Sequence, residues 1–238
     1  MVWWIIATVC AFFVKGLCGF ANTLIFTTIM SFGLSNRNIS PVELLLGYPT
    51  NAFIAWQERR KMDWKLCLPL AALVVLGSIP GMLLLKNADT GAVKLLFGMV
   101  IVGIGIEMLL RERSTKKAKE SRALLALIGL LSGVLCGLYG IGALLGAYIG
   151  RVARDSGAFR ANICFVFFVE NTMRIALYSA VGILTVGMLL QALYLAPFMA
   201  LGMDLGVKSR ALLDERSAKK LVIVMLIVSG LSLIAAQI

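Results

Sequence analysis

Long apolar stretches separated by short charged segments run along the whole chain. Several of them approach the ~20 residues that an α-helix needs to cross a ~30 Å hydrocarbon core, which predicts membrane-spanning helices. Glycines and a lysine interrupt the first stretch, and glycines interrupt the fifth, so these two do not fit a simple crossing. The apolar stretches are Val2–Phe32, Val42–Gln57, Leu66–Leu85, Gly91–Leu110, Leu124–Gly150, Ala161–Ala180, Met188–Met203 and Leu221–Gln237.

The segment Gly129–Gly150 carries glycines at four-residue steps on either side of a break at Leu138–Ile141. Each series puts small residues on one helical face, where another helix can approach closely. Each half has only about ten to fifteen residues, too few to cross a bilayer. The pattern fits a re-entrant helical hairpin, and it also fits one long, tilted spanning helix. The glycines in question are Gly129, Gly133, Gly137, Gly142, Gly146 and Gly150.

The distribution of Lys and Arg favours the hairpin. If every apolar stretch crossed once, the basic segments Arg111–Arg122 and Asp204–Lys220 would lie on opposite sides of the membrane. If Val2–Phe32 and Leu124–Gly150 are both hairpins, about eighteen basic residues fall in loops on one side and about three on the other. Because basic loops stay in the cytoplasm, we expect these loops there and both termini on the extracytoplasmic side.

The two halves of the chain carry a weak internal repeat, with three ordered matches at an offset of about 120 residues. One hairpin and three spans give each half an odd number of crossings, which inverts the second half, as in many secondary transporters. We therefore predict an all-α polytopic membrane protein of two inverted repeats, each a re-entrant helical hairpin plus three transmembrane helices. Residues 1–110 form the first repeat, 111–122 a basic cytoplasmic linker and 123–238 the second repeat. The matches pair Gly16–Gly19 with Val134–Gly137, Asn51 with Asn171, and Gly81–Leu83 with Gly202–Asp204.

Composition and charge support the same class of protein. The hydrophobic fraction is 60%, and cytoplasmic basic loops explain the net charge of +11 better than nucleic-acid binding does. The chain has no His, and it lacks the nucleophile, zinc and phosphate-loop motifs of common enzymes. Its five cysteines lie in or beside apolar stretches without a CxxC pair, which is typical of small buried residues. We therefore expect no enzymatic activity, no metal and no cofactor.

Charged and amide side chains inside the apolar stretches are the candidate site. Arg174 should lie deep in the membrane, four residues after Glu170 on the same helical face. The two residues could form a structural ion pair, or Arg174 could bind an oxyanion while Glu170 acts as a gate or proton-coupling group. Broken helix tips present free N–H groups that suit an anion, and their glycines serve either close approach or helix packing. The candidate substrate-binding residues are Lys15, Gly16, Gly19, Asn22, Asn51, Gly137, Gly140, Gly142, Asn171 and Arg174.

Three other charged residues have an alternative to a role in the site, or a simpler explanation than one. Lys15, near the tip of the first hairpin, could be a second positive element of the site, or it could extend its amine to the membrane interface. Glu43 and Glu107 lie near the ends of apolar stretches, where solvation explains them.

The chain resembles the sulfite exporter TauE/SafE family, also called the 4-toluene sulfonate uptake permease family, over nearly its whole length. Many members have prolines just after the glycines of the second hairpin, whereas this chain reads Gly142-Ala143-Leu144-Leu145, which leaves local geometry and substrate preference open. The segments that carry the resemblance are Phe13–Phe20, Gly133–Gly142, Phe159–Asn162, Asn171–Tyr178, Gly182–Thr185, Gly202–Gly206 and Arg216–Lys220.

The resemblance implies transport of small sulfur-containing anions, such as sulfite or organosulfonates, across the bacterial inner membrane. We expect a secondary transporter that alternates access between its repeats, with the anion and the lipid bilayer as partners and homo-oligomer formation open. An anion channel of the same architecture is an alternative. A membrane thiol-dependent enzyme or carrier that uses Cys18 and Cys136 is a third hypothesis.

Overall fold

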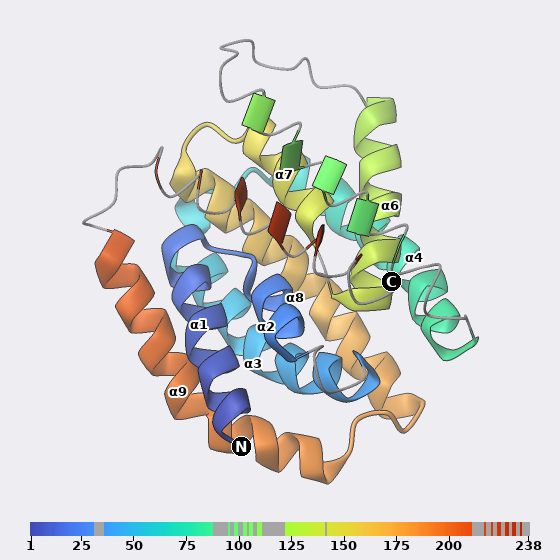
Figure 1. Ribbon diagram of the computed structural model, residues 1–238. Coiled ribbons are helices and arrows are strands. Elements are labelled where there is room, and N and C mark those ends of the chain that lie inside the picture. The colour runs from blue at the N-terminus through green and yellow to red at the C-terminus, as the bar shows by residue number, and fades with distance from the viewer. Residues whose placement is uncertain are drawn as a thin grey trace.

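Helices make up every regular element of the described chain (Figure 1). The computed structural model describes residues 1–30, 36–87, 122–140 and 142–210, with isolated positions between 95 and 110 and between 217 and 234. These residues contain no strand, so the predicted all-α class is confirmed. The helices are α1 (Val2–Cys18), α2 (Asn22–Met30), α3 (Asn36–Gln57), the 3-10 helix η1 (Arg59–Lys61), α4 (Trp64–Asn87), α6 (Arg122–Tyr139), α7 (Ala143–Val152), α8 (Ser156–Ala180) and α9 (Val186–Arg210).

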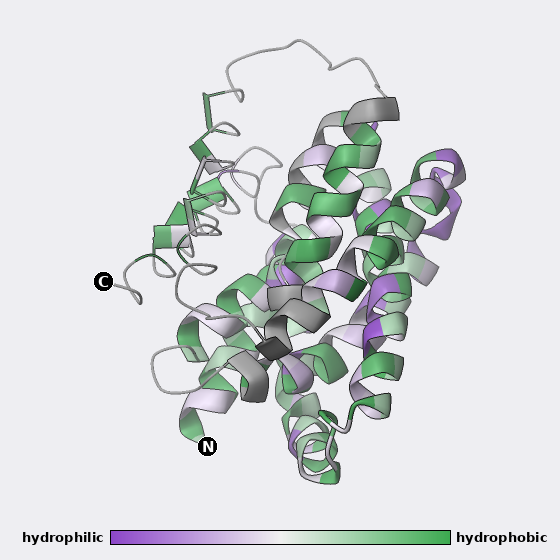
Figure 2. Cartoon of the chain, turned by 90° about the vertical axis from the view of Figure 1, so that its right-hand side faces the viewer, coloured by the Kyte–Doolittle hydropathy of each residue, from purple (hydrophilic) through white to green (hydrophobic). Residues whose placement is uncertain are grey.

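Three of these helices, α4, α8 and α9, are long and apolar enough to cross a membrane. Helices α1 and α6 contain shorter apolar segments, Val2–Cys18 and Leu125–Gly137. Hydrophobic residues continue along most helices in Figure 2, and α9 exposes large apolar side chains such as Val186, Leu193 and Leu201. Apolar surface on this scale fits contact with lipid, so the chain is a membrane protein.

Helices α1 and α2, and likewise α6 and α7, are joined by a tight turn and pack against each other. Gly19 caps α1 with φ of 88°, and its N–H donates to the Lys15 carbonyl over 2.6 Å. Gly140 follows α6 with φ of 70°. Glycine adopts this left-handed backbone without steric penalty, so each helix ends there. One continuous helix across residues 129–150 is therefore wrong. The first break, predicted at Lys15–Gly19, comes at the end of that range, at Gly19–Ala21, and Lys15 lies in the last turn of α1.

The first helix of each two-helix unit packs on a long helix of the other half of the chain. Helix α1 packs along α9, and α6 packs along α4. A Cβ atom on Gly16 would lie 2.5 Å from the Met203 carbonyl oxygen, and one on Gly133 would collide with the Val74 carbonyl. These pairs therefore approach backbone to backbone, as small residues allow in membranes. The predicted small-residue face of Gly129–Gly137 is confirmed as the contact with α4.

Helices α3 and α8 pack against each other in the middle of the molecule, between the α1–α9 pair and the α4–α6 pair (Figure 1). The ring of Tyr48 on α3 stacks on Phe168 of α8, with centroids 5.1 Å apart and planes 21° apart. At the start of α8, Asp155 accepts a hydrogen bond from the Ala158 N–H, a helix cap that fixes where α8 begins. Polar side chains of both helices, Glu43 and Asn51 of α3 and Asn171 and Arg174 of α8, line one interior cavity.

The predicted linker, residues 111–122, lies outside the described residues except for Arg122, where α6 begins. Glu107 also lies outside them.

Candidate functional site

A small cavity lies where the turns of the two hairpins meet α3 and α8. The cavity volume open to the centre of a water molecule is about 20 Å³, which is enough for about one water. The first hairpin, the second hairpin and the two central helices all contribute to its wall. The lining residues are Phe20, Ala21, Asn22, Thr23 and Leu24 from the first hairpin, Gly140 and Gly142 from the second, Glu43 and Asn51 from α3, and Phe167, Asn171 and Arg174 from α8.

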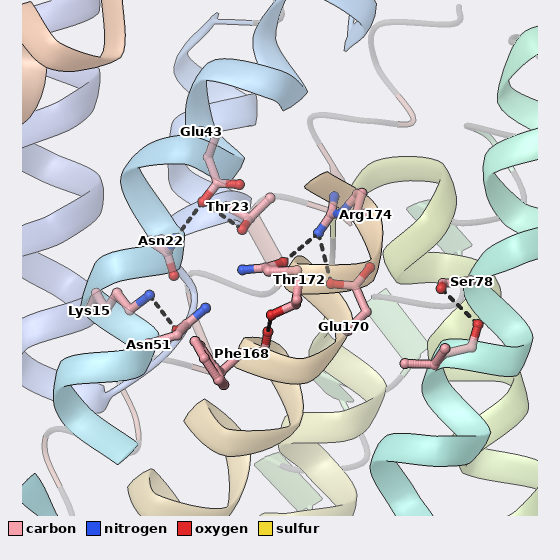
Figure 3. A network of polar contacts seen from close by, with 12 residues as sticks. Lys15, Asn22, Thr23, Glu43, Asn51, Ser78, Phe168, Glu170, Thr172 and Arg174 are labelled. Atoms are coloured by element: carbon pink, nitrogen blue, oxygen red, sulfur yellow. Dashed lines mark hydrogen bonds and ion pairs between the residues drawn. The ribbon is translucent and has the colours of Figure 1, made fainter. Parts of the chain in front are cut away.

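Arg174 is the cation of the cavity wall, and the residue is only 2% exposed. Its Nη2 donates to Glu170 Oε2 over 3.1 Å and to Asn171 Oδ1 over 3.0 Å (Figure 3). Its Nε and Nη1 have no hydrogen-bond partner among the described residues. A Cβ atom on Gly140 would lie 2.8 Å from Nη1, so the second turn approaches the guanidinium closely. Arg174 therefore holds unused donors beside the cavity, and a buried donor without a partner is costly.

Glu170 stands behind Arg174 and does not line the cavity. Its side chain is fully buried, and its Oε1 has no hydrogen-bond partner among the described residues. The predicted ion pair with Arg174 is confirmed. Because two charges removed from water need each other, the pair holds the guanidinium in a fixed position.

Glu43 was expected to be solvated, and this expectation is wrong, because the residue is 2% exposed. Its Oε1 accepts hydrogen bonds from the Asn22 amide and from the Thr23 hydroxyl, the latter over 2.9 Å (Figure 3). Helix α3 begins at Asn36, so Glu43 lies two turns inside it, and the first hairpin packs over that face. The carboxylate thereby holds the first turn of α2. An amide and a hydroxyl side by side in an otherwise apolar hairpin were the sequence signal for a buried polar partner.

Lys15 is 1% exposed, so extension to the membrane interface is wrong. Its Nζ donates to Asn51 Oδ1 over 2.7 Å and to the Gly47 carbonyl over 3.4 Å. Asn51 lines the cavity, whereas Lys15 does not. The lysine thus reaches the site through the asparagine.

The predicted site residues divide into two groups. Asn22, Asn51, Gly140, Gly142, Asn171 and Arg174 meet around the cavity. Lys15, Gly16, Gly19, Gly137 and Glu170 lie outside its wall.

The glycines of the second group have other contacts. Gly16 packs on α9 and Gly137 on α4, so helix packing accounts for both. Gly19 lies against the side chain of Arg160, and its carbonyl accepts a hydrogen bond from the Cys164 thiol.

The sequence reasoning missed Thr23, Glu43 and two aromatic residues of the wall. A Cβ atom on Gly142 would collide with the Phe167 ring, and one on Gly146 would lie 2.8 Å from the ring of Phe20. Both rings therefore seal the sides of the second hairpin. Nothing in the local pattern separates them from the other phenylalanines of this apolar chain.

The cavity combines one guanidinium, one carboxylate, three side-chain amides, the first turn of α2, and Gly142, which caps the N-terminus of α7. Helix N-termini carry free N–H groups and the positive end of the helix dipole, so together with Arg174 they suit an anion. Within the described part of the chain, no three His, Cys, Asp or Glu side chains gather into a metal-binding group.

A family model described as "Sulfite exporter TauE/SafE" matches residues 4–233, nearly the whole chain. No match was found among curated proteins or among solved structures.

Proposed function

Because the chain belongs to the sulfite exporter TauE/SafE family and is thus a membrane transporter of sulfur-related anions, we propose that it is a secondary transporter of sulfite or an organosulfonate. It works by alternating access between two inverted repeats. The observation that carries the proposal is Arg174, a buried cation with unused donors at the point where two helix turns meet. A small oxyanion satisfies such donors.

The pattern of helix contacts supports two related halves. A shift of about 120 residues relates α1 to α6, α4 to α9 and α3 to α8. The contact of α1 with α9 then corresponds to the contact of α6 with α4, and both contacts are present. The same correspondence leaves the contact of α3 with α8 unchanged. Tyr48 and Phe168, separated by the repeat offset of about 120 residues, stack on each other, as equivalent residues beside a two-fold axis do. Asn51 and Asn171 share this offset, and both line the cavity.

The anion in this mechanism lies between the two turns. Arg174 supplies its unpartnered Nη1 beside the second turn, Asn22 and Asn171 supply amides, and the N-termini of α2 and α7 supply backbone N–H groups. Gly140 and Gly142 let the second turn approach the ligand. Lys15 adds positive charge through Asn51, and Glu170 acts as the gating partner that keeps Arg174 in place.

Space in the cavity bears on how the anion enters. Room for one water does not hold a sulfonate group, so the walls must move apart for binding. Rearrangement of one hairpin relative to the other opens the cavity to one side of the membrane at a time. A closed cavity of this size favours a carrier over an open anion channel.

For the orientation, we place the basic loops in the bacterial cytoplasm and both termini on the other side of the inner membrane. A terminal epitope accessible in intact spheroplasts is expected. Accessibility only after permeabilisation would reverse this orientation and leave the transport proposal intact.

Flux into proteoliposomes tests the function. The panel is sulfite, taurine, an aryl sulfonate, sulfate, acetate and chloride, with and without a pH gradient. We expect saturable flux of one or more sulfur oxyanions and its loss in Arg174→Gln, at least ~100-fold, because the guanidinium is the only cation in the described cavity wall. Arg60→Gln, an exposed arginine of η1, is the matched control and retains the flux.

Other results would redirect the proposal. Flux that rises without saturation, with large conductance, indicates the channel. No saturable flux of any sulfur anion means that the substrate class is wrong. Unchanged flux in Arg174→Gln removes this residue from the site. Replacement of Cys18 and Cys136 with alanine is expected to leave transport intact, and its loss would favour the thiol-dependent hypothesis.

A further inference from the structure

Two buried carboxylates flank Arg174, and they have different partners. Glu170 forms an ion pair with the guanidinium and lies outside the cavity wall. Glu43 lies in the wall, and it accepts hydrogen bonds from two neutral groups, the Asn22 amide and the Thr23 hydroxyl. No Lys or Arg of the described chain lies within 4.0 Å of the Glu43 carboxylate. A proton added to Glu43 therefore breaks no ion pair, whereas one added to Glu170 breaks the pair with Arg174.

The charge of Glu43 is balanced only at longer range. Arg174 from α8 and Lys15 from α1 are the charged groups of the described chain that act on it, and α2 presents only neutral side chains to it. An anion in the cavity occupies the free donors of Arg174. It also brings a second negative charge into the same small space as Glu43. Two like charges in a shared site of low dielectric disfavour each other strongly, and a proton on one of them removes the conflict.

We infer that Glu43 is the proton-binding group of the transporter, and that anion binding in the cavity is coupled to proton uptake at its carboxylate. The inference rests on the proposed function and deepens it. The proton comes from water and travels with the anion, so the loaded site carries both. By linkage, a bound proton strengthens anion binding to the same extent that a bound anion strengthens proton binding.

Protonation of Glu43 also leaves the first hairpin in place. A protonated carboxyl keeps an oxygen that accepts the bonds from Asn22 and Thr23. Glu43→Gln mimics this state, since its amide carbonyl accepts the same bonds without charge. We therefore expect Glu43→Gln to fold like the wild type and to bind the anion without taking up a proton.

Isothermal titration calorimetry of the purified full chain in nanodiscs tests this inference. Each anion of the sulfur panel is titrated at several pH values and in buffers of different ionisation enthalpy, which gives the number of protons taken up per anion. The measured quantity is the wild-type value minus the Glu43→Gln value, so that protonation of sulfite itself cancels. We expect a difference of about one proton, and a wild-type affinity that falls about tenfold per pH unit once Glu43 is ionised.

Glu43→Gln is expected to bind with the tight affinity of the wild type at low pH, and to keep it at high pH. Asp204→Asn removes an exposed carboxylate from α9 and is the matched control, with the proton count of the wild type. Anion binding with no difference in proton count overturns the role of Glu43 and leaves the transport proposal standing. No binding of any sulfur anion, in the wild type as in the variants, overturns the proposed function and this inference with it.

Discussion

Asn51 and Asn171, which the proposed repeat makes equivalent, accept hydrogen bonds from different cations. Asn51 accepts from Lys15 over 2.7 Å, and Asn171 accepts from Arg174 over 3.0 Å. The lysine comes from the first hairpin, whereas the arginine lies on α8 itself, where the first half has the apolar Ile54. Related positions thus receive positive charge by unrelated routes.

The surroundings of the two cations differ as well. Lys15 Nζ donates to two neutral oxygens, and the residue lies outside the cavity wall. Arg174 binds a carboxylate through Nη2, its Nε and Nη1 have no partner among the described residues, and it forms part of the wall. A shared backbone arrangement therefore carries two different chemistries. In the proposed mechanism the arginine binds the anion, and the lysine holds its asparagine in position.

The largest expected effect on flux comes from adding one negative charge at each of the two asparagines, which tests whether the two cations differ in role. Asn171→Asp adds a third carboxylate near Arg174, after Glu43 and Glu170, so we expect anion flux to fall about 100-fold, the equivalent of ~2.7 kcal/mol. Asn51→Asp lies within reach of Lys15, which compensates its charge, so flux should fall less than about tenfold. Proteoliposome flux at matched protein density measures both. Equal losses in the two variants would mean that the cations have the same role.

A second test concerns the turn that faces Arg174. Gly140→Ala forces a left-handed backbone on a residue with a Cβ, at a cost of about 1–2 kcal/mol, and places that atom against the guanidinium. We expect flux to fall about tenfold. Gly150→Ala is the control, because its Cβ meets the Phe159 ring at 3.7 Å, an ordinary contact. If Gly140→Ala transports like the control, the second turn does not shape the site.

Lys15→Gln sharpens the assignment of the lysine to a positioning role. The glutamine amide can still donate to Asn51, but the positive charge is lost. We expect a flux decrease of only a few-fold, with a stability loss of about 1–3 kcal/mol from the weakened buried hydrogen bonds. Thermal unfolding and flux are measured on the same sample. A loss as large as that in Arg174→Gln would place Lys15 in direct contact with the anion.

The smallest expected effect concerns the ion pair that joins the halves near the loops. Arg160 of α8 donates to Glu58 over 2.8 Å, and this hydrogen bond holds the pKa of Glu58 below its usual value. The pair therefore adds stability above the ordinary pKa of Glu58, and the contribution is lost as pH falls through the lowered value. We expect Glu58→Gln to lower Tm by about 2 °C at pH 7 and to match the wild type in acid. A gap in Tm that persists in acid would mean that the contact is not an ion pair.

The helix breaks and the small-residue faces could be predicted from the sequence, because glycine spacing is a local signal. Gly140 ends α6, as its place in the break suggested. The same signal could not separate glycines that line the cavity from those that pack helices. Gly137 faces α4 rather than the cavity, and only the position of a helix from the other half decides this.

Only part of the candidate site could be predicted from the sequence, because some of it depends on long-range packing. Arg174 is conspicuous in any hydropathy profile, because a charge in the middle of an apolar stretch is rare. Glu43 lies near the edge of such a stretch, where local hydropathy predicts solvation. Its burial depends on α2, which is more than ten residues away in the sequence and packs against α3. Long-range packing of this kind leaves no periodic trace in one chain.

The close backbone contacts of α1 with α9 and of α6 with α4 amount to a swap within one molecule. The first helix of each half packs against a long helix of the other half, α1 against α9 and α6 against α4. Neither half is then complete alone, since it would expose glycine-lined backbone that only its counterpart can cover. Any displacement of α9 also carries α1, and with it the turn at Gly19. In the proposed mechanism, the bodies that move during transport are these exchanged assemblies, each of which combines one helix from either half of the chain.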